Sequence, residues 1–130
     1  LRCIIEADDR MREHTLQFLQ HLPFPPRRLL TSELAIAQVL PGPVRARRRD
    51  LINAYDDLLR TFITPVPIQR RLLAHAARLL ARTPGLALAD ALHLACAQQQ
   101  GAEVFATTEA QLAVEPPMRR WLMVAPDGLN

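Results

Sequence analysis

A long, mainly apolar stretch in the second half of the chain carries the clearest structural signal. Residues Leu86–Ala97 are apolar except for Asp90 and His93, which predicts a buried helix. Gly101 follows closely, and a glycine just after the last helical residue suits a left-handed helix cap. The short apolar run Val104–Ala106 then predicts a buried strand, which ends in a polar step toward another helical turn.

Apolar spacing and turn residues predict the remaining elements. Helices are expected where apolar side chains recur every three or four positions and where proline or glycine ends the pattern. These helices span Met11–Leu22, Glu33–Leu40, Val44–Phe62 and Ile68–Arg82. Strands are expected at Leu29–Thr31, Phe62–Val66 and Trp121–Ala125. Pro65 and Pro67 favour an edge position for the second of these strands, and Ser32 is a good helix N-cap.

Two carboxylates stand out because of where this pattern places them. In open α/β sheets, functional sites lie beyond the carboxyl ends of the parallel strands. Glu109 would lie there, and a crossing helix start could bring Asp90 beside it. Two carboxylates in one cleft repel each other unless a cation joins them, and oxygen ligands suit Mg²⁺ or Mn²⁺. The alternative is that both are ordinary helix-start acids, stabilised by the helix dipole.

The amino-acid sequences of three segments resemble a known protein family. Leu88–Ala95 reads Leu-Ala-Asp-Ala-Leu-His-Leu-Ala, and Gly101–Leu112 reads Gly-Ala-Glu-Val-Phe-Ala-Thr-Thr-Glu-Ala-Gln-Leu. Earlier, Thr31–Leu40 opens with Thr-Ser and ends with Ala-Gln-Val-Leu. In residue identity, order and spacing these segments resemble PIN domains, and more narrowly the VapC-type toxin ribonucleases of bacterial toxin–antitoxin pairs.

This resemblance implies both a fold and a site. The fold would be an α/β/α sandwich with a parallel central sheet and helices on both faces. Asp90 falls on one metal-site acid of the family and Glu109 on the last one, whereas Gln38 stands where the family has a glutamate. The implied activity is a Mg²⁺- or Mn²⁺-dependent nuclease that acts on RNA, usually with an antitoxin and often as a homodimer.

The start of the chain departs from the family pattern. The family's first strand carries an aspartate, and we align the opening residues of this chain with the helix that follows that strand. Asp8 and Asp9 come too late in the motif to replace that aspartate, and Asp9 can cap the following helix. We therefore expect residues 1–130 to form a single PIN-like domain that is shortened at its N-terminus and lacks the first strand.

The charged residues permit a nucleic-acid partner. The net charge is +3, and all 16 basic residues are arginines, which pair well with phosphate. An arginine cluster at the start of the helix predicted over Val44–Phe62 is a candidate RNA contact, formed by Arg45, Arg47, Arg48 and Arg49. The alternative is a solvated helix face, with nearby aspartates such as Asp50 compensating the charge.

Cys3, Cys96 and His93 lie in apolar patterns. Both cysteines are expected to be buried free thiols, which suits a reducing cytosol and a cytoplasmic protein. His93 lies on the same side of its helix as Asp90, but its apolar neighbours favour a hydrogen-bonded core histidine over a catalytic one. No apolar run is long enough to cross a membrane.

Three functional interpretations follow from these residues. The first is a PIN-type endoribonuclease with a degenerate acidic site, in which Asp90 and Glu109 bind the metal ion and Gln38 is a weak or water-mediated ligand. The second is a catalytically weakened PIN-fold module that binds RNA or a protein partner. The third is an ordinary structural or interaction domain whose carboxylates are helix-start acids. The first interpretation also predicts that Asp90, Glu109 and Gln38 converge at the carboxyl ends of the central strands.

Overall fold

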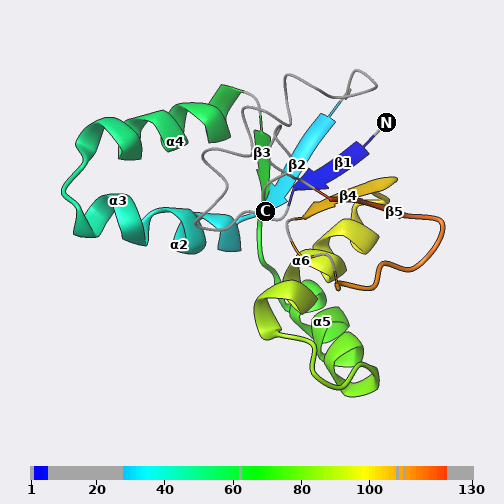
Figure 1. Ribbon diagram of the computed structural model, residues 1–130. Coiled ribbons are helices and arrows are strands. Elements are labelled where there is room, and N and C mark those ends of the chain that lie inside the picture. Colours follow the sequence, from blue (N-terminus) through cyan, green and yellow to red (C-terminus); the bar gives the residue numbers. More distant parts are fainter. Residues whose placement is uncertain (1, 6–27, 62, 108, 110, 123–130) are drawn as a thin grey trace.

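A parallel sheet forms the centre of the protein in the computed structural model, which describes residues 2–5, 28–61, 63–107, 109 and 111–122 (Figure 1). Over these residues the strands are β1 (Arg2–Ile5), β2 (Arg28–Ser32), β3 (Ile63–Val66), β4 (Val104–Thr107) and β5 (Arg119–Leu122). They pair in the order β3-β2-β1-β4-β5, and every neighbouring pair is parallel. The expected α/β fold with a parallel central sheet is therefore confirmed.

The strand β1 corrects one expectation. The first strand was predicted to be missing, but Arg2–Ile5 occupies the centre of the sheet. Ile4 pairs with Leu30 of β2 on one side and with Phe105 of β4 on the other. The prediction was wrong because a central parallel strand needs only a short apolar run without alternation, and the opening was assigned to a helix instead.

The described helices lie between strands along the chain, before and after β3, and such alternation is typical of α/β folds. They are α2 (Leu34–Val39), α3 (Pro41–Arg45), α4 (Arg49–Thr61), α5 (Arg70–Arg82) and α6 (Leu88–Gln99). Figure 1 shows α5 and α6 together on one side of the sheet, whereas α2, α3 and α4 extend away from its β3 edge. The helix predicted over Met11–Leu22 and the tail from residue 123 onward lie outside the described residues.

The helix α6 contributes much of the hydrophobic core. Its residues from Ala91 to Ala97 are all buried, as the apolar stretch predicted. The core cluster joins α6 to Leu30 of β2, to Phe105 of β4 and to the inner face of α5. A helix that is apolar all round is stable only when neighbours cover every side of it. Burial of α6 therefore fixes how α5 and the sheet sit against each other.

The helix predicted over Val44–Phe62 is interrupted. The structure ends α3 at Arg45 and begins α4 at Arg49, with Arg47 in the left-handed region at φ 54°. The N–H of Arg48 donates to the carbonyl of Pro43 at 2.9 Å, and the N–H of Arg47 donates to the carbonyl of Val44 at 3.1 Å. These two bonds form a Schellman cap, which a left-handed residue closes. The sequence did not predict this cap, because glycine usually occupies the left-handed position that Arg47 occupies here.

The helix α6 ends with the same pair of bonds around a glycine. Gly101 has φ 64°, its N–H donates to the carbonyl of Gln98 at 3.2 Å, and the N–H of Ala102 donates to the carbonyl of Ala97 at 2.9 Å. Gly101 therefore closes α6 as the sequence predicted. Beyond it, all four residues of β4 are buried, which confirms the predicted strand.

The two edges of the sheet differ in composition from its centre. Pro65 lies within β3, which is an edge strand as predicted, and its register partner is Thr31 of β2. The opposite edge strand, β5, begins with Arg119 and Arg120. The described residues contain no helix that is both long and apolar enough to cross a bilayer.

The two Schellman caps predict substitutions of opposite sign. Gly101→Ala should lower the free energy of unfolding by about 1 kcal/mol, because an L side chain is strained at positive φ. Arg47→Gly should leave stability unchanged or raise it by up to about 1 kcal/mol, since it removes that strain. Urea unfolding midpoints would measure both. Gly42→Ala is the control, because Gly42 is helical and a Cβ there meets nothing within 4 Å. Equal losses at Gly42 and Gly101 would contradict the explanation.

Candidate active site

The carboxyl ends of β2 and β4 carry polar side chains that are completely buried. Ser32 ends β2 and Thr107 ends β4, and both side chains have no exposed surface. The Ser32 Oγ accepts a hydrogen bond from the Leu34 N–H at 3.2 Å, and the Thr107 Oγ1 accepts one from the Glu109 N–H at 3.0 Å. Each hydroxyl therefore fixes the backbone two residues later and turns the chain away from its strand.

Gln38 contacts α6 through a side-chain hydrogen bond. The Nε2 of His93 lies 2.6 Å from the Oε1 of Gln38, so the imidazole N–H donates to the amide oxygen. His93 is fully buried and Gln38 is half-buried. This bond joins α2, which follows directly from the end of β2, to the first half of α6. The prediction that His93 is a hydrogen-bonded core histidine is confirmed.

The same bond brings Gln38 to the part of α6 that carries Asp90. Asp90 lies in the first turn of α6 and is half-buried. It precedes His93 by three residues, about 4.5 Å of helix rise, and therefore projects from the same side of the helix. Because α2 starts at the carboxyl end of β2, Gln38 and the first half of α6 meet beyond that edge of the sheet.

Glu109 reaches the same edge of the sheet by another route. It comes two residues after the end of β4, and its side chain is exposed. A backbone bond from the Leu112 N–H to the Glu109 carbonyl, at 3.3 Å, closes a single turn there. The convergence of Glu109 with Asp90 and Gln38 stays a prediction.

Glu6 is a candidate acid that the sequence reasoning overlooked. In the sequence it directly follows Ile5, the last residue of β1. Glu6 itself lies outside the described residues. The signal that could have found it is the run Cys3-Ile-Ile-Glu6, a short apolar strand that ends in an acid.

The oxygen donors at this edge fit a divalent cation in type. Within residues 2–5, 28–61, 63–107, 109 and 111–122, no three His, Cys, Asp or Glu side chains gather at one point. The candidate donors there are the carboxylates of Asp90 and Glu109 and the amide of Gln38. Carboxylate and amide oxygens are the ligands that Mg²⁺ and Mn²⁺ prefer. The Gln38 oxygen already accepts from His93, so it has only its remaining lone pair for a metal ion or a water.

The arginine cluster of Arg45, Arg47, Arg48 and Arg49 lies at the junction of α3 and α4, and all its members are exposed. Arg48 binds Asp50 with two bonds, Nε to Oδ1 at 2.9 Å and Nη2 to Oδ2 at 2.8 Å. Asp50 therefore compensates one arginine, as the alternative interpretation expected. Within the described part of the chain, no hydrogen bond or ion pair engages the side chains of Arg45, Arg47 and Arg49.

Cys96 confirms the expectation of a buried free thiol. It has no exposed surface and forms no disulfide. Burial raises the pKa of its thiol to about 11, so the sulfur stays protonated at neutral pH. This cysteine is therefore part of the core packing.

Comparison with known proteins decides the family. The model of the PIN domain matches residues 3–114, beginning inside β1. This chain belongs to the PIN domain family. Ribonuclease VapC23 of Mycobacterium tuberculosis, found in two strains, is 33% identical over 109 residues, which cover 84% of this chain and 86% of the relative. The resemblance seen in the sequence is confirmed.

A solved structure agrees with this PIN fold. The crystal structure of Mycobacterium tuberculosis VapC20, described as a Sarcin-Ricin loop cleaving toxin, superposes with a TM-score of 0.65 at 14% identity. The match covers 85% of this chain and 92% of that chain. At this identity the likeness shows a shared fold alone.

The bond between Gln38 and His93 should contribute measurably to stability. Gln38→Met keeps the size of the side chain but removes the acceptor of the buried His93 N–H, so we expect a loss of about 1–2 kcal/mol in the free energy of unfolding. The double variant Gln38→Met/His93→Leu should lose less than the sum of its single variants, as measured by urea denaturation. Gln111→Met, at an exposed glutamine, is the control and should have little effect. Strict additivity would contradict the proposed coupling.

The pair formed by Arg48 and Asp50 predicts an acidic titration. The hydrogen bond from Arg48 is the main cause that lowers the pKa of Asp50 from 3.8 to about 2; partial desolvation opposes it, and the positive charge of Arg48 contributes a smaller lowering. Because the folded-state pKa is depressed, the pair's contribution to stability is present above pH 3.8 and is lost as the pH falls through about 2. An NMR titration of the Asp50 carboxyl should show this midpoint, and Arg48→Gln should return it to the ordinary range. An unchanged midpoint in Arg48→Gln would refute the assignment.

Proposed function

We propose that this PIN domain protein is a metal-dependent endoribonuclease of the toxin type, with a site built from few acids. The observation that carries the proposal is the hydrogen bond between Gln38 and His93. It brings the family-like segment Thr31–Leu40 next to the first half of α6, which carries Asp90. The name of the relative that is 33% identical, a ribonuclease, supports the choice of activity.

Each residue of the site has a separate proposed role. Asp90 and Glu109 supply the negative charge that attracts Mg²⁺ or Mn²⁺. Glu6, which follows β1 in the sequence, is the third carboxylate that we assign to the site. Gln38, held by His93, contributes a neutral oxygen or orients a water molecule. A divalent cation bound there would activate water and stabilise charge on the scissile phosphate.

The arginine cluster is the proposed contact for the RNA backbone. Arg45, Arg47 and Arg49 are exposed at one helix junction, and guanidinium groups bind phosphate oxygens in pairs. Such contacts position the RNA but do not read its sequence. We further propose that the protein pairs with an antitoxin, forms a homodimer and acts in the cytoplasm. These three proposals rest on its similarity to VapC proteins.

A second function has one specific observation in its favour. The neutral Gln38, whose oxygen already accepts a hydrogen bond, weakens any metal site compared with a glutamate at the same position. The protein would then be a PIN-fold module that binds RNA or a protein partner without cleaving. Gln38→Glu separates the two functions. RNA cleavage that appears only in this variant favours the binding module, whereas cleavage by the wild-type protein excludes it.

The enzyme proposal predicts that metal binding depends on Asp90. Millimolar Mn²⁺ should raise the melting temperature of the wild-type protein by several degrees, because a ligand that binds only the folded state stabilises it. Asp90→Asn should abolish this shift and slow RNA cleavage by about a hundredfold. Asp57→Asn, at an exposed acid of α4, is the control and should retain both properties. An equal Mn²⁺ shift in the wild-type protein and Asp90→Asn would reject Asp90 as a ligand.

A further inference from the structure

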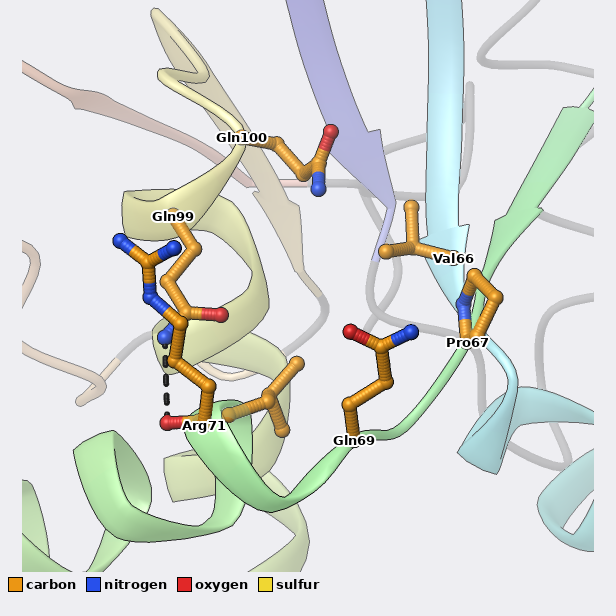
Figure 2. Close-up of a pocket in the computed structure, with 7 residues that line it drawn as sticks. Val66, Pro67, Gln69, Arg71, Gln99 and Gln100 are labelled. Atoms are coloured by element: carbon orange, nitrogen blue, oxygen red, sulfur yellow. Dashed lines mark hydrogen bonds between the residues drawn. The ribbon is translucent and has the colours of Figure 1, made fainter.

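A polar pocket outside the candidate metal site has no assigned role. It has a volume of about 330 Å³ and lies where the end of β3, the start of α5 and the end of α6 meet (Figure 2). Its lining residues are Val66, Pro67, Gln69, Arg71, Leu72, Gln99 and Gln100. This volume lies near the lower end of the range found for small-molecule sites.

The chemistry of this pocket is that of amides. Gln69 precedes α5, whereas Gln99 and Gln100 lie at the end of α6, and Figure 2 shows their amide groups directed toward a common space. The Gln99 Nε2 donates to the carbonyl oxygen of Arg71 at 3.2 Å, which leaves its own amide oxygen facing that space (Figure 2). An amide presents a donor next to an acceptor, and none of the described residues that line the pocket carries a carboxylate.

The apolar and charged parts of the lining narrow the choice of ligand. Leu72 is buried, and with Val66 and Pro67 it offers an apolar wall for a flat ring. Arg71 is exposed, and its guanidinium lies beside Gln99 at the rim (Figure 2). A flat, neutral group with donors and acceptors on its edge, attached to an anion, satisfies all of these features. Unpaired RNA bases have this chemistry and are bound in proteins by stacking and edge hydrogen bonds.

The position of the pocket connects it to the proposed RNA path. Val66 ends β3 and pairs with Ser32, the last residue of β2, so one wall belongs to the carboxyl edge of the sheet. Gln100 follows His93 by seven residues, about 10 Å of helix rise. An RNA strand that crosses the candidate metal site is therefore within reach of the pocket.

We propose that this pocket binds one unpaired base of the RNA, with Arg71 contacting the adjacent phosphate. The inference rests on the proposed function, because that function supplies the RNA. It deepens that function by giving the protein a means to choose where it cleaves. The amides of Gln69 and Gln99 read the edge of the base, and the apolar wall contacts its face.

The test measures binding without cleavage. Labelled hexamers of adenylate, cytidylate and uridylate are titrated in EDTA, and fluorescence anisotropy gives each affinity. The wild-type protein should prefer one hexamer by about fivefold or more, since a bidentate contact to a base discriminates by that factor or more. Gln69→Leu should remove the preference. Gln69 is exposed and its side chain makes no capping bond to α5, so this variant should keep its melting temperature.

The arginine arm of the experiment has a matched control. Arg71→Gln should weaken binding of all three hexamers alike and reduce the salt dependence, as loss of a phosphate contact does. Arg78→Gln removes the same charge from an exposed position of α5 outside the pocket and should change neither property. Absence of base preference in the wild-type protein, or a preference that survives Gln69→Leu, would overturn the inference. If the wild-type protein shows neither the Mn²⁺-induced rise in melting temperature nor RNA cleavage but still prefers one base, the proposed nuclease activity fails and the base pocket stands.

Discussion

The structure depends on burying the central seven residues of the helix α6. The residues of α6 from Ala91 to Ala97 are all buried, so this part of the helix is covered on every side. Small side chains such as Ala91 and Ala95 allow its neighbours to approach closely, and Phe105 of β4 joins the same core cluster. Because α6 also carries Asp90 in its first turn, the packing that stabilises the fold also determines where the candidate site lies.

The parts of the fold that could be predicted depend on local signals. The burial of α6, the cap at Gly101, the strand β4 and the edge position of β3 all follow from apolar runs, glycine and proline. The strand β1 was missed because its sequence, Arg-Cys-Ile-Ile, is too short to show a period. The break at Arg47 was missed because an arginine in the left-handed region leaves no mark in the sequence.

Only those residues of the candidate site that lie within recognisable sequence motifs could be predicted. Asp90, Glu109 and Gln38 could be named from their segments, but the partner of Gln38 could not, because His93 lies 55 residues away in the sequence. The same holds for the pocket, since Gln69 lies 30 residues before Gln99 in the sequence and becomes its neighbour only when α5 packs on α6. Long-range contacts between polar side chains carry no periodic signal. A buried imidazole that engages the amide oxygen also gives Gln38 a structural reason to be there, apart from any role toward a metal ion.

The composition of the sheet edges bears on how this protein behaves at high concentration. An exposed edge strand offers unpaired N–H and C=O groups to any other chain, which is a route to aggregation. Pro65 removes one N–H from β3, and Arg119 and Arg120 place charge on β5. Among the described strands, the two at the ends of the sheet order are therefore poor templates for pairing with a strand of another molecule.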